Sequence, residues 1–533
     1  MINRPELSVG EALVGLLEAY GVDTIFGIPG VHNIEMYRAL PRSKIRHILP
    51  RHEQGAGFMA DGYARATGKP GVCFTISGPG VTNILTPMGQ AWSDSINMLV
   101  IASALDMADS AQGRGRLHEM IDQRAATAAV TNLHMRAYTP KDVRDGLARA
   151  FSHFSSQRPR PAYLEIPLDM LKVPAGAGWL PRPLPQRARP HPEQVAAVVA
   201  RLNAAKRPVI ILGGGALDAG TAALQIAEKL NAPILTTTAG KGAVPADHPL
   251  CLGYRLSHTG IAAFLQSADA ILCAGSQLSE TDFWTEHVID QNLIRIDIDA
   301  DSLSRPHTAE LAIQADAKAT LEAIVPGLLS RSGGGINMSS DGNTIDLPLV
   351  VADDTKRQLV AILKAIRASL PRNAIVCSDM TQIAYVANEA FPVYEPRSWF
   401  HPVGFGTLGF ALPAGIGAKL GVGDKKPVAV LIGDYGFQYT LNDLGTAVEL
   451  KLPIPILLWN NNLLGAIHDN MVVHGIQPNA VTLRNPDFQM LAKAYGCHAT
   501  KPANLEELAR NIAAALKADG PTLIEMTPQM ALV

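Results

Sequence analysis

Two polar residues, Asp434 and Asn461, have the types and the spacing to hold a metal ion. They lie 27 residues apart in GDYGFQYTLNDLGTAVELKLPIPILLWNNN, whose apolar runs and Gly-rich turn predict a strand, a turn, a helix and a second strand. Both side chains would then reach the same edge of a parallel sheet. Hard oxygen donors beside a helix N-terminus suit a Mg²⁺ ion that bridges a diphosphate. An ordinary strand-to-helix turn followed by an Asn-rich loop is the alternative interpretation.

The rest of the chain has the pattern of the sheets that such a site needs. Short β-branched runs such as VCFTIS, PVIILGG and PVAVLIGD alternate with helical patterns, which predicts an α/β protein with doubly wound parallel sheets throughout. The stretches 174–194 and 331–348 are rich in Pro or in Gly and Ser, and have the composition of surface linkers. They divide the chain into three predicted domains, 1–175, 190–335 and 350–533.

Composition argues against several classes of function. The 533 residues are 47% apolar, enough core for about three domains. The formal charge of -2, with no long basic run, argues against nucleic acid and membrane as partners. No segment has the apolar block of a signal peptide or the ~18 apolar residues of a membrane span, so we expect a cytoplasmic protein. The scattered cysteines are expected to be buried rather than paired or metal-bound: Cys73, Cys251, Cys273, Cys377 and Cys497.

The first and last predicted domains repeat one pattern. Gly62 precedes Gly78 by 16 residues, and Gly417 precedes Gly433 by the same 16, each pair joining a small-residue helix to the end of a strand. Small residues one helical turn apart let a helix lie close on a sheet, so generic α/β packing explains the pattern. An internal duplication explains it equally well.

The segment from Asp434 to Asn461 resembles the cofactor signature of thiamine diphosphate enzymes, Gly-Asp-Gly followed by Asn-Asn. The resemblance covers essentially the whole chain and implies that family's fold, with a pyrimidine-binding domain, a central domain and a diphosphate-binding domain. It implies thiamine diphosphate and Mg²⁺ as cofactors. By the same resemblance the metal ligands are the Asp434 carboxylate, the Asn461 side-chain oxygen and the backbone carbonyl of Leu463.

The diphosphate turn departs from this signature at one position. Gly433 and Asp434 match it, but Tyr435 stands where the family has Gly, and Gly436 follows directly. The tighter turn puts phosphate binding in more doubt than the metal position. Thr381 and Gln382 align with a loop that touches the diphosphate in relatives, although a simple strand-end turn is an equally good interpretation.

Glu53, in LPRHEQGAGFMADGYA, matches the family's essential glutamate. That residue hydrogen-bonds the ring nitrogen N1′ of the aminopyrimidine and favours its imino form, in a dry site that strengthens the contact. A helix-terminal acid stabilised by the helix dipole is the simpler alternative. Since Glu53 and Asp434 lie in different domains that meet across a subunit interface in the family, the resemblance implies a homodimer, with tetramers common.

The loop GFGTLGFALPAGIGAK is expected to hold the pyrimidine end of the cofactor. In relatives a bulky aliphatic side chain between the two rings enforces a bent conformation. Here that position is Leu408, with the Gly406 carbonyl and the Leu408 amide available to the pyrimidine. The middle domain contains RPVIILGGGALDAG without the full dinucleotide spacing, and lacks the Arg-Phe-Asp-Asp-Arg signature of flavin-carrying relatives. FAD is therefore not expected, and the domain is interpreted as structural.

The reaction implied by the resemblance starts from a 2-oxo acid. Loss of CO₂ leaves a nucleophilic carbon that is either protonated, which gives an aldehyde, or added to a second carbonyl. His118 lies where acetolactate synthases and pyruvate oxidases carry Gln, and a His there suits the proton donor of a decarboxylase. A solvated loop His is the alternative.

Glu280 and Asp282 suggest a cationic substrate. Two carboxylates one residue apart face the same side of an extended strand and would suit a guanidinium group. With FGIPGVHNIEMYRAL and GDYGFQYT, they make the chain resemble the 5-guanidino-2-oxopentanoate decarboxylase branch. The competing hypotheses are an acetolactate-synthase-like carboligase, favoured by SGPGVTN and GTLGF, and a catalytically silent cofactor-binding relative, favoured by Tyr435.

Overall fold

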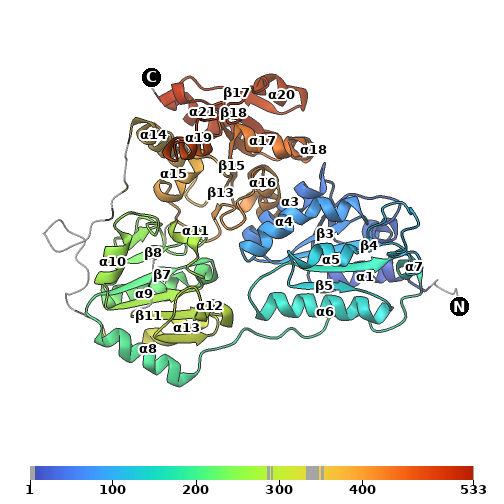
Figure 1. Cartoon of the computed structure of the whole chain (residues 1–533), viewed down its shortest axis with the longest axis horizontal. Helices are drawn as coiled ribbons and strands as arrows, with labels where there is room; N and C mark the ends of the chain where they lie inside the picture. The colour runs from blue at the N-terminus through green and yellow to red at the C-terminus, as the bar shows by residue number, and fades with distance from the viewer. Residues whose placement is uncertain are drawn as a thin grey trace.

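The computed structural model describes residues 6–284, 289, 292–331, 347, 349 and 353–531. It contains three six-stranded sheets in which every strand pair is parallel, one sheet in each third of the chain (Figure 1). Their strands are short runs of buried Val, Ile and Leu, as expected for parallel sheets covered by helices on both faces. The predicted α/β fold with three doubly wound parallel sheets is confirmed. Most of the predicted linker 331–348 lies outside the described residues.

The N-terminal domain contains the sheet β2-β1-β3-β4-β6-β5. Its strands are β1 (Thr24–Gly27), β2 (Arg46–Ile48), β3 (Gly71–Thr75), β4 (Met98–Ala104), β5 (Leu133–Arg136) and β6 (Ala162–Pro167). Its helices are α1 (Val9–Ala19), α2 (Ile34–Tyr37), α3 (Glu53–Thr67), α4 (Pro79–Ser93), α5 (Gln123–Ala128), α6 (Pro140–Ser156) and α7 (Leu168–Lys172). Capping boxes begin α1 and α6, where Ser8 and Thr139 accept from backbone amides of the first turn.

The central domain contains the sheet β12-β11-β10-β7-β8-β9. Its strands are β7 (Pro208–Leu212), β8 (Ile234–Thr236), β9 (Cys251–Gly253), β10 (Ala270–Ala274), β11 (Leu293–Asp297) and β12 (Leu311–Gln314). Its helices are α8 (Pro192–Ala204), α9 (Gly220–Leu230), α10 (Ile261–Ser267), α11 (Glu280–Phe283), α12 (Ala300–Ser304) and α13 (Ala317–Ile324). Helix α8 begins inside the first predicted linker, because Pro is well suited to the first turn of a helix.

The C-terminal domain contains the sheet β14-β13-β15-β16-β18-β17. Its strands are β13 (Ile375–Ser378), β14 (Trp399–Phe400), β15 (Val428–Gly433), β16 (Pro455–Trp459), β17 (His498–Thr500) and β18 (Thr522–Met526). Its helices are α14 (Asp354–Ser369), α15 (Gln382–Ala390), α16 (Ala411–Val422), α17 (Asp434–Thr440), α18 (Leu444–Glu449), α19 (Gly465–Val473), α20 (Phe488–Ala494) and α21 (Leu505–Ala515).

Each sheet has an interior point at which strand order reverses, and the carboxyl ends of the strands beside that point are where α/β proteins bind ligands. In the N-terminal domain the reversal lies between β1 and β3, in the central domain between β7 and β10, and in the C-terminal domain between β13 and β15. The first and third of these places carry the residues that the sequence singles out, since Gly78 follows β3 and Asp434 follows β15.

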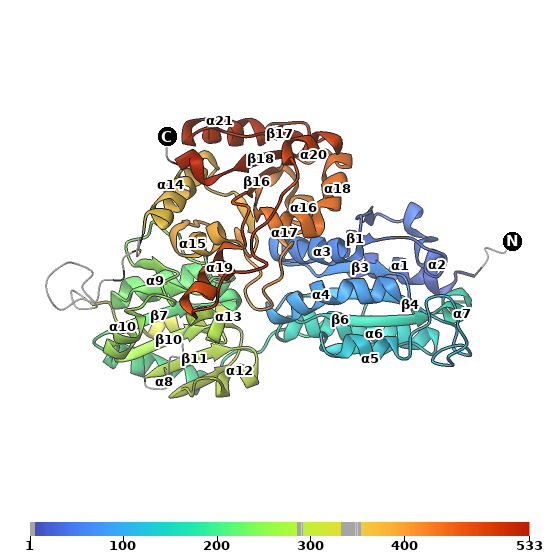
Figure 2. The ribbon, with the colours of Figure 1, turned by 45° about the horizontal axis from the view of Figure 1, so that its top comes forward.

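Helices α3 and α16 pack against each other and join the outer domains, an arrangement visible from both directions in Figures 1 and 2. A Cβ added at Gly62 would lie 2.0 Å from the Ala414 carbonyl oxygen, and one added at Gly417 would lie 1.8 Å from that of Met59. These two glycines therefore serve a helix-helix contact, not the helix-sheet contact that their spacing suggested. Gly415, two residues before Gly417, does face the sheet, where an added Cβ would meet Val430 at 2.4 Å.

Other sequence expectations can be compared directly with the described residues. All five cysteines are free thiols, four of them buried and Cys251 partly so. Among the described helices, none combines the length and the apolar character required to cross a membrane.

Candidate active site

Asp434 is the first residue of α17, directly after β15, and is only 2% exposed. Its Oδ1 accepts from the Tyr435 amide at 2.9 Å, and its Oδ2 accepts from the Asn462 amide at 2.9 Å and from Asn485 Nδ2 at 2.7 Å. Burial raises the pKa of this carboxyl, and these hydrogen bonds oppose the rise. No Lys, Arg or His pairs with Asp434 among the described ion pairs. The site is thus a buried carboxylate without a cationic side chain as counterion.

Asn461 and Leu463 follow the neighbouring strand β16. The Asn461 Oδ1 accepts from the Leu463 amide at 3.2 Å, and its Nδ2 donates to Gln382 at 3.3 Å. Asn462 between them has a left-handed backbone with φ of 55°, which turns the chain back beside Asp434. Within the described ranges no cluster of three or more His, Cys, Asp or Glu residues could hold a metal. One carboxylate, one amide oxygen and one carbonyl nevertheless fit Mg²⁺, which typically binds through few protein ligands plus phosphate and water.

The turn after β15 accommodates Tyr435 without strain. Its φ is not in the left-handed region, and its ring packs against that of Tyr439 one helical turn later, with centroids 5.3 Å apart. The positions in this turn that leave no room for a side chain are the glycines on either side of Tyr435. A Cβ added at Gly433 would lie 2.6 Å from Thr381 Oγ1, and one added at Gly436 would lie 2.9 Å from Asp379 Oδ1. The departure from Gly at position 435 therefore leaves the turn intact.

Asp379, which the sequence reasoning missed, anchors the loop that carries Leu408. It is fully buried at the end of β13, and its carboxylate accepts from the amides of Gly409 at 3.1 Å and Ala411 at 2.9 Å. Burial raises its pKa to about 6. Its position directly after a β-branched run was a signal that could have found it. Asn485 lies in an irregular segment, and no periodic signal marks it.

The Leu408 loop is also tied to the N-terminal domain of the same chain. Thr407 Oγ1 donates to Gln90 at 2.7 Å, and the Gly404 amide donates to Asp94 at 2.8 Å. Within the described residues, no hydrogen bond uses the Gly406 carbonyl or the Leu408 amide. These two backbone groups and the half-buried Leu408 side chain thus remain available to a ligand.

Glu53 begins α3, with His52 as its N-cap, as its place in the sequence predicts. The residue is 9% exposed, and its Oε2 accepts from Asn83 Nδ2 at 2.9 Å. An added Cβ on Gly80 would lie 3.5 Å from Glu53 Oε1. Helix α3 therefore carries Glu53 beside the turn after β3.

His118 lies beside the same turn. Its backbone is left-handed, with φ of 63°, and an added Cβ on Gly78 would lie 2.8 Å from the His118 Cβ. The His118 ring meets the ring of His32 edge to face, with centroids 4.9 Å apart. Sequence reasoning missed His32, although it follows the carboxyl end of β1 and so lies at the predicted ligand-binding edge.

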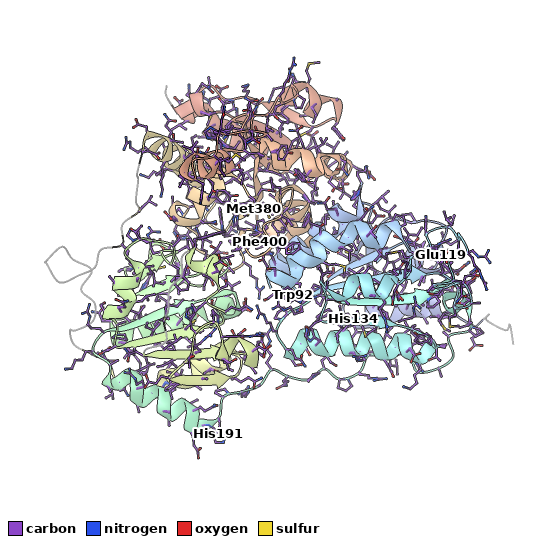
Figure 3. All side chains as sticks on the ribbon, in the orientation of Figure 1. Trp92, Glu119, His134, His191, Met380 and Phe400 are labelled. Carbon is purple, nitrogen blue, oxygen red and sulfur yellow. The ribbon has the colours of Figure 1, made fainter. Side chains whose placement is uncertain are left out.

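Glu53 and His118 belong to the N-terminal domain, and Asp434 and Asn461 to the C-terminal domain. No described hydrogen bond or ion pair joins these four residues across the domains, although the Arg51 amide, two residues before Glu53, donates to Asp443 of the C-terminal domain at 2.9 Å. Figure 3 shows Glu119, next to His118 in sequence, on the far side of the N-terminal domain from Met380 of the C-terminal domain.

The expectation that Glu280 and Asp282 face one side of an extended strand is wrong. They lie on the short helix α11, where residues two apart point in different directions. Glu280 is exposed, whereas Asp282 is buried and its Oδ2 accepts from the Ser279 amide at 3.1 Å as part of a capping box. Both line a cavity of about 510 Å³ that residues of all three domains surround, among them Arg65 of the N-terminal domain and Trp399 of the C-terminal domain. Its described lining residues do not include Asp434 or Asn461.

Comparisons with known proteins agree with this geometry. Family models match the N-terminal TPP-binding domain of thiamine pyrophosphate enzymes at residues 7–126, their central domain at 195–324 and their C-terminal TPP-binding domain at 379–526. The chain is 47% identical to the probable 2-ketoarginine decarboxylase AruI of Pseudomonas aeruginosa, over 99% of this chain and 95% of that protein. It is 30% identical to the acetolactate synthase isozyme 1 large subunit of Escherichia coli, over 98% of this chain and 94% of that protein.

A solved structure shows the same fold. A candidate thiamin diphosphate-dependent enzyme from Mycobacterium smegmatis superposes with a TM-score of 0.82 at 24% identity, covering 98% of this chain and 99% of that one. Together, the three family models and the relatives that match almost the whole length show that the chain belongs to the thiamine pyrophosphate enzyme family.

Proposed function

We propose that this protein is a non-oxidative 2-oxo acid decarboxylase that releases an aldehyde and CO₂ from a guanidino-bearing substrate. The observation that carries the substrate class is the 47% identity, over almost the entire chain, to a probable 2-ketoarginine decarboxylase. Thiamine diphosphate, when bound, supplies the thiazolium carbon that adds to the 2-oxo group and takes up the electrons released as CO₂ leaves.

Asp434, Asn461 and the Leu463 carbonyl hold Mg²⁺ in this proposal. The support is the buried Asp434 carboxylate without a cationic partner in the described chain, beside two further oxygen donors at the carboxyl edge of the sheet. Thr381 and Gln382 at the start of α15 and the turn from Gly433 to Gly436 then face the diphosphate, at the N-termini of two helices.

Glu53 acts on the pyrimidine end of the cofactor. Glu53 is buried and its carboxylate is oriented by Asn83, so it can share a proton with a ring nitrogen with little competition from water. The Gly406 carbonyl, the Leu408 amide and the Leu408 side chain hold the rest of that ring and fix its orientation. No described contact joins Glu53 to Asp434 within one chain, and in this proposal Glu53 of a second protomer completes the site.

The active unit is therefore a homodimer, and a tetramer is compatible with it. Large apolar side chains are exposed around both groups of site residues, as expected for surfaces that a second copy covers. On the N-terminal domain these are Val31, Ile34, Met107, Leu117 and Ile121, and on the C-terminal domain Phe405, Tyr439, Ile467, Val472, Val473 and Ile476.

His118 is the proton donor that completes decarboxylation. It gives a proton to the carbon from which CO₂ has left, so the net reaction consumes one 2-oxo acid anion and one proton and forms one aldehyde and one CO₂. For the guanidinium end of the substrate, the exposed Glu280 is the better candidate, because Asp282 is buried and bonded to its own helix. A solvent-facing carboxylate can still pair with a cation that approaches from outside.

A panel of 2-oxo acids tests the proposal. The purified enzyme with thiamine diphosphate and Mg²⁺ should release CO₂ fastest from 5-guanidino-2-oxopentanoate, with the corresponding aldehyde as product. Sedimentation of the same sample should give a dimer or a larger assembly. Absence of CO₂ release from every acid, with cofactor still bound in calorimetry, would instead identify a catalytically silent relative.

A carboligase is the second candidate, favoured by the 30% identity to acetolactate synthase over nearly the full chain. Chromatography of products from pyruvate alone separates the two functions. Acetolactate would favour the carboligase, while acetaldehyde or no turnover would favour the decarboxylase.

A further inference from the structure

Two imidazole rings lie together at the ligand-binding edge of the N-terminal sheet. His32 follows β1 and Ser77 follows β3, the two strands between which strand order reverses. The His32 Nδ1 is 2.8 Å from Ser77 Oγ, which fixes that ring. The His118 ring meets it at an interplanar angle of 67°, with centroids 4.9 Å apart. This position is the crevice in which a doubly wound domain binds its ligand.

His118 is held there by the backbone as well as by the ring contact. Its left-handed φ of 63° is uncommon for a residue with a side chain. An added Cβ on Gly78 would lie 2.8 Å from both the Cβ and the carbonyl oxygen of His118, so only glycine allows this approach. The His118 Nδ1 is buried and has no hydrogen-bond partner in the described chain. A buried imidazole nitrogen without a partner is costly unless a ligand or a proton-dependent contact uses it.

The charged groups around His32 and His118 favour a state in which only one of the two rings is positively charged. Burial and the nearby His118 both lower the pKa of His32, and Asp106, which follows β4, opposes this. Glu53 lies beyond Gly80 on the same edge. Two imidazolium ions at this separation would repel each other, whereas one cationic ring against the face of a neutral ring is favourable.

We infer that His32 is a positioning residue that stays neutral, held by Ser77, and leaves the single proton of the pair on His118. This inference rests on the proposed function, in which His118 protonates the carbon left by CO₂. After the transfer both rings are neutral, and water restores the proton to His118. His32 thus fixes which ring is charged and where that ring lies, without touching the substrate itself.

Histidine titrations test the pair independently of activity. The holoenzyme labelled with [¹³C]histidine is titrated by NMR, and signals are assigned with the His32→Gln and His118→Gln variants. We expect His118→Gln to raise the titration midpoint of His32, because a like charge has been removed. An unchanged His32 midpoint would overturn the inference. His134→Gln, a change at an exposed histidine on β5 of the same domain (Figure 3), is the matched control and should leave both midpoints unchanged.

Product release provides the second readout. In His32→Gln, the first-turnover burst of CO₂ should keep its amplitude, while steady aldehyde release falls about tenfold and its pH profile shifts, because only the proton transfer after CO₂ loss is affected. Ser77→Ala, which removes one hydroxyl, should shift the profile in the same direction without unfolding the domain. Aldehyde release equal to that of His134→Gln in both variants would refute the inference. Absence of the CO₂ burst in the unmodified enzyme would instead refute the proposed function, and the NMR result would still decide on the pair.

Discussion

Gly417→Ala should weaken the contact that joins the two outer domains. The new Cβ would lie 1.8 Å from the Met59 carbonyl oxygen, whereas an ordinary contact is at least 3.4 Å, so α3 and α16 must separate by about 1.6 Å along that direction. Overpacking of this kind costs about 1 to 3 kcal/mol. Alanine regains about 1 kcal/mol as a better helix former. We therefore expect a net loss of up to about 2 kcal/mol in the free energy of unfolding.

Activity should fall more than stability does, because α3 carries Glu53 at its first turn. A misplacement of about 1 Å of a group that must meet the reacting atoms can cost about 100-fold in rate. Urea unfolding gives the stability change, and CO₂ release from the best 2-oxo acid gives the rate. Cofactor affinity is measured separately by fluorescence quenching, since Asp434 and Asn461 lie on other elements and should retain the metal.

Gly15→Ala is the matched control. Gly15 lies within α1, and no atom lies within 4 Å of an added Cβ. The control should gain about 0.5 to 1 kcal/mol and keep full activity. If Gly417→Ala were as stable and as active as Gly15→Ala, the tight packing of α3 on α16 would not be what positions Glu53, and the reasoning would be refuted.

Further predictions concern single carboxylates. Glu53→Gln should lower kcat at least about 100-fold while thiamine diphosphate still binds, as calorimetry can check; unchanged kcat would remove Glu53 from the mechanism. Asp434→Ala should weaken Mg²⁺-dependent cofactor retention at least about 100-fold in equilibrium dialysis, and retention equal to the unmodified enzyme would contradict the metal assignment. Glu280→Gln should lower kcat/KM for the guanidino substrate about tenfold relative to pyruvate, and an unchanged ratio would exclude its pairing with the guanidinium. Asp282 has its pKa raised by burial from 3.8 to about 6, so the folded state favours its protonated form; its contribution to stability is complete below about pH 4 and is lost as the pH rises to 6. Asp282→Asn should remove up to about 3 kcal/mol of that pH dependence. If the melting temperature changed by the same amount between pH 4.5 and pH 7 in both proteins, this assignment would be contradicted.

The fold class could be predicted from sequence because it depends on local composition. Buried parallel strands require runs of β-branched residues, and the segments around PVIILGG and PVAVLIGD form the strands that these runs predict. Asp434 and Asn461 could be found for the same reason, since each lies within two residues of the end of such a strand. The sequence around Glu53 also predicted that this residue begins a helix.

Residues whose significance depends on a distant neighbour could not be found in this way. Gly62 and Gly417 have the spacing of a helix on a sheet, yet they meet another helix, because the domain arrangement decides which surface lies opposite. Asp282 has the same carboxylate as Glu280, but a capping box buries it. The sequence gives the type of each side chain, but it does not give the direction in which that side chain points on a four-residue helix.

The sequence alone thus determined the elements, the strand ends that carry polar residues and, through its motif, the family. The tertiary structure decided which of those ends lie together: His32 beside His118, Thr381 beside Gly433, and the Leu408 loop tied to Gln90 in another domain. The physical reason is that strand and helix formation depends on neighbours a few residues apart, whereas a site is assembled by the order of strands and by packing between segments hundreds of residues apart.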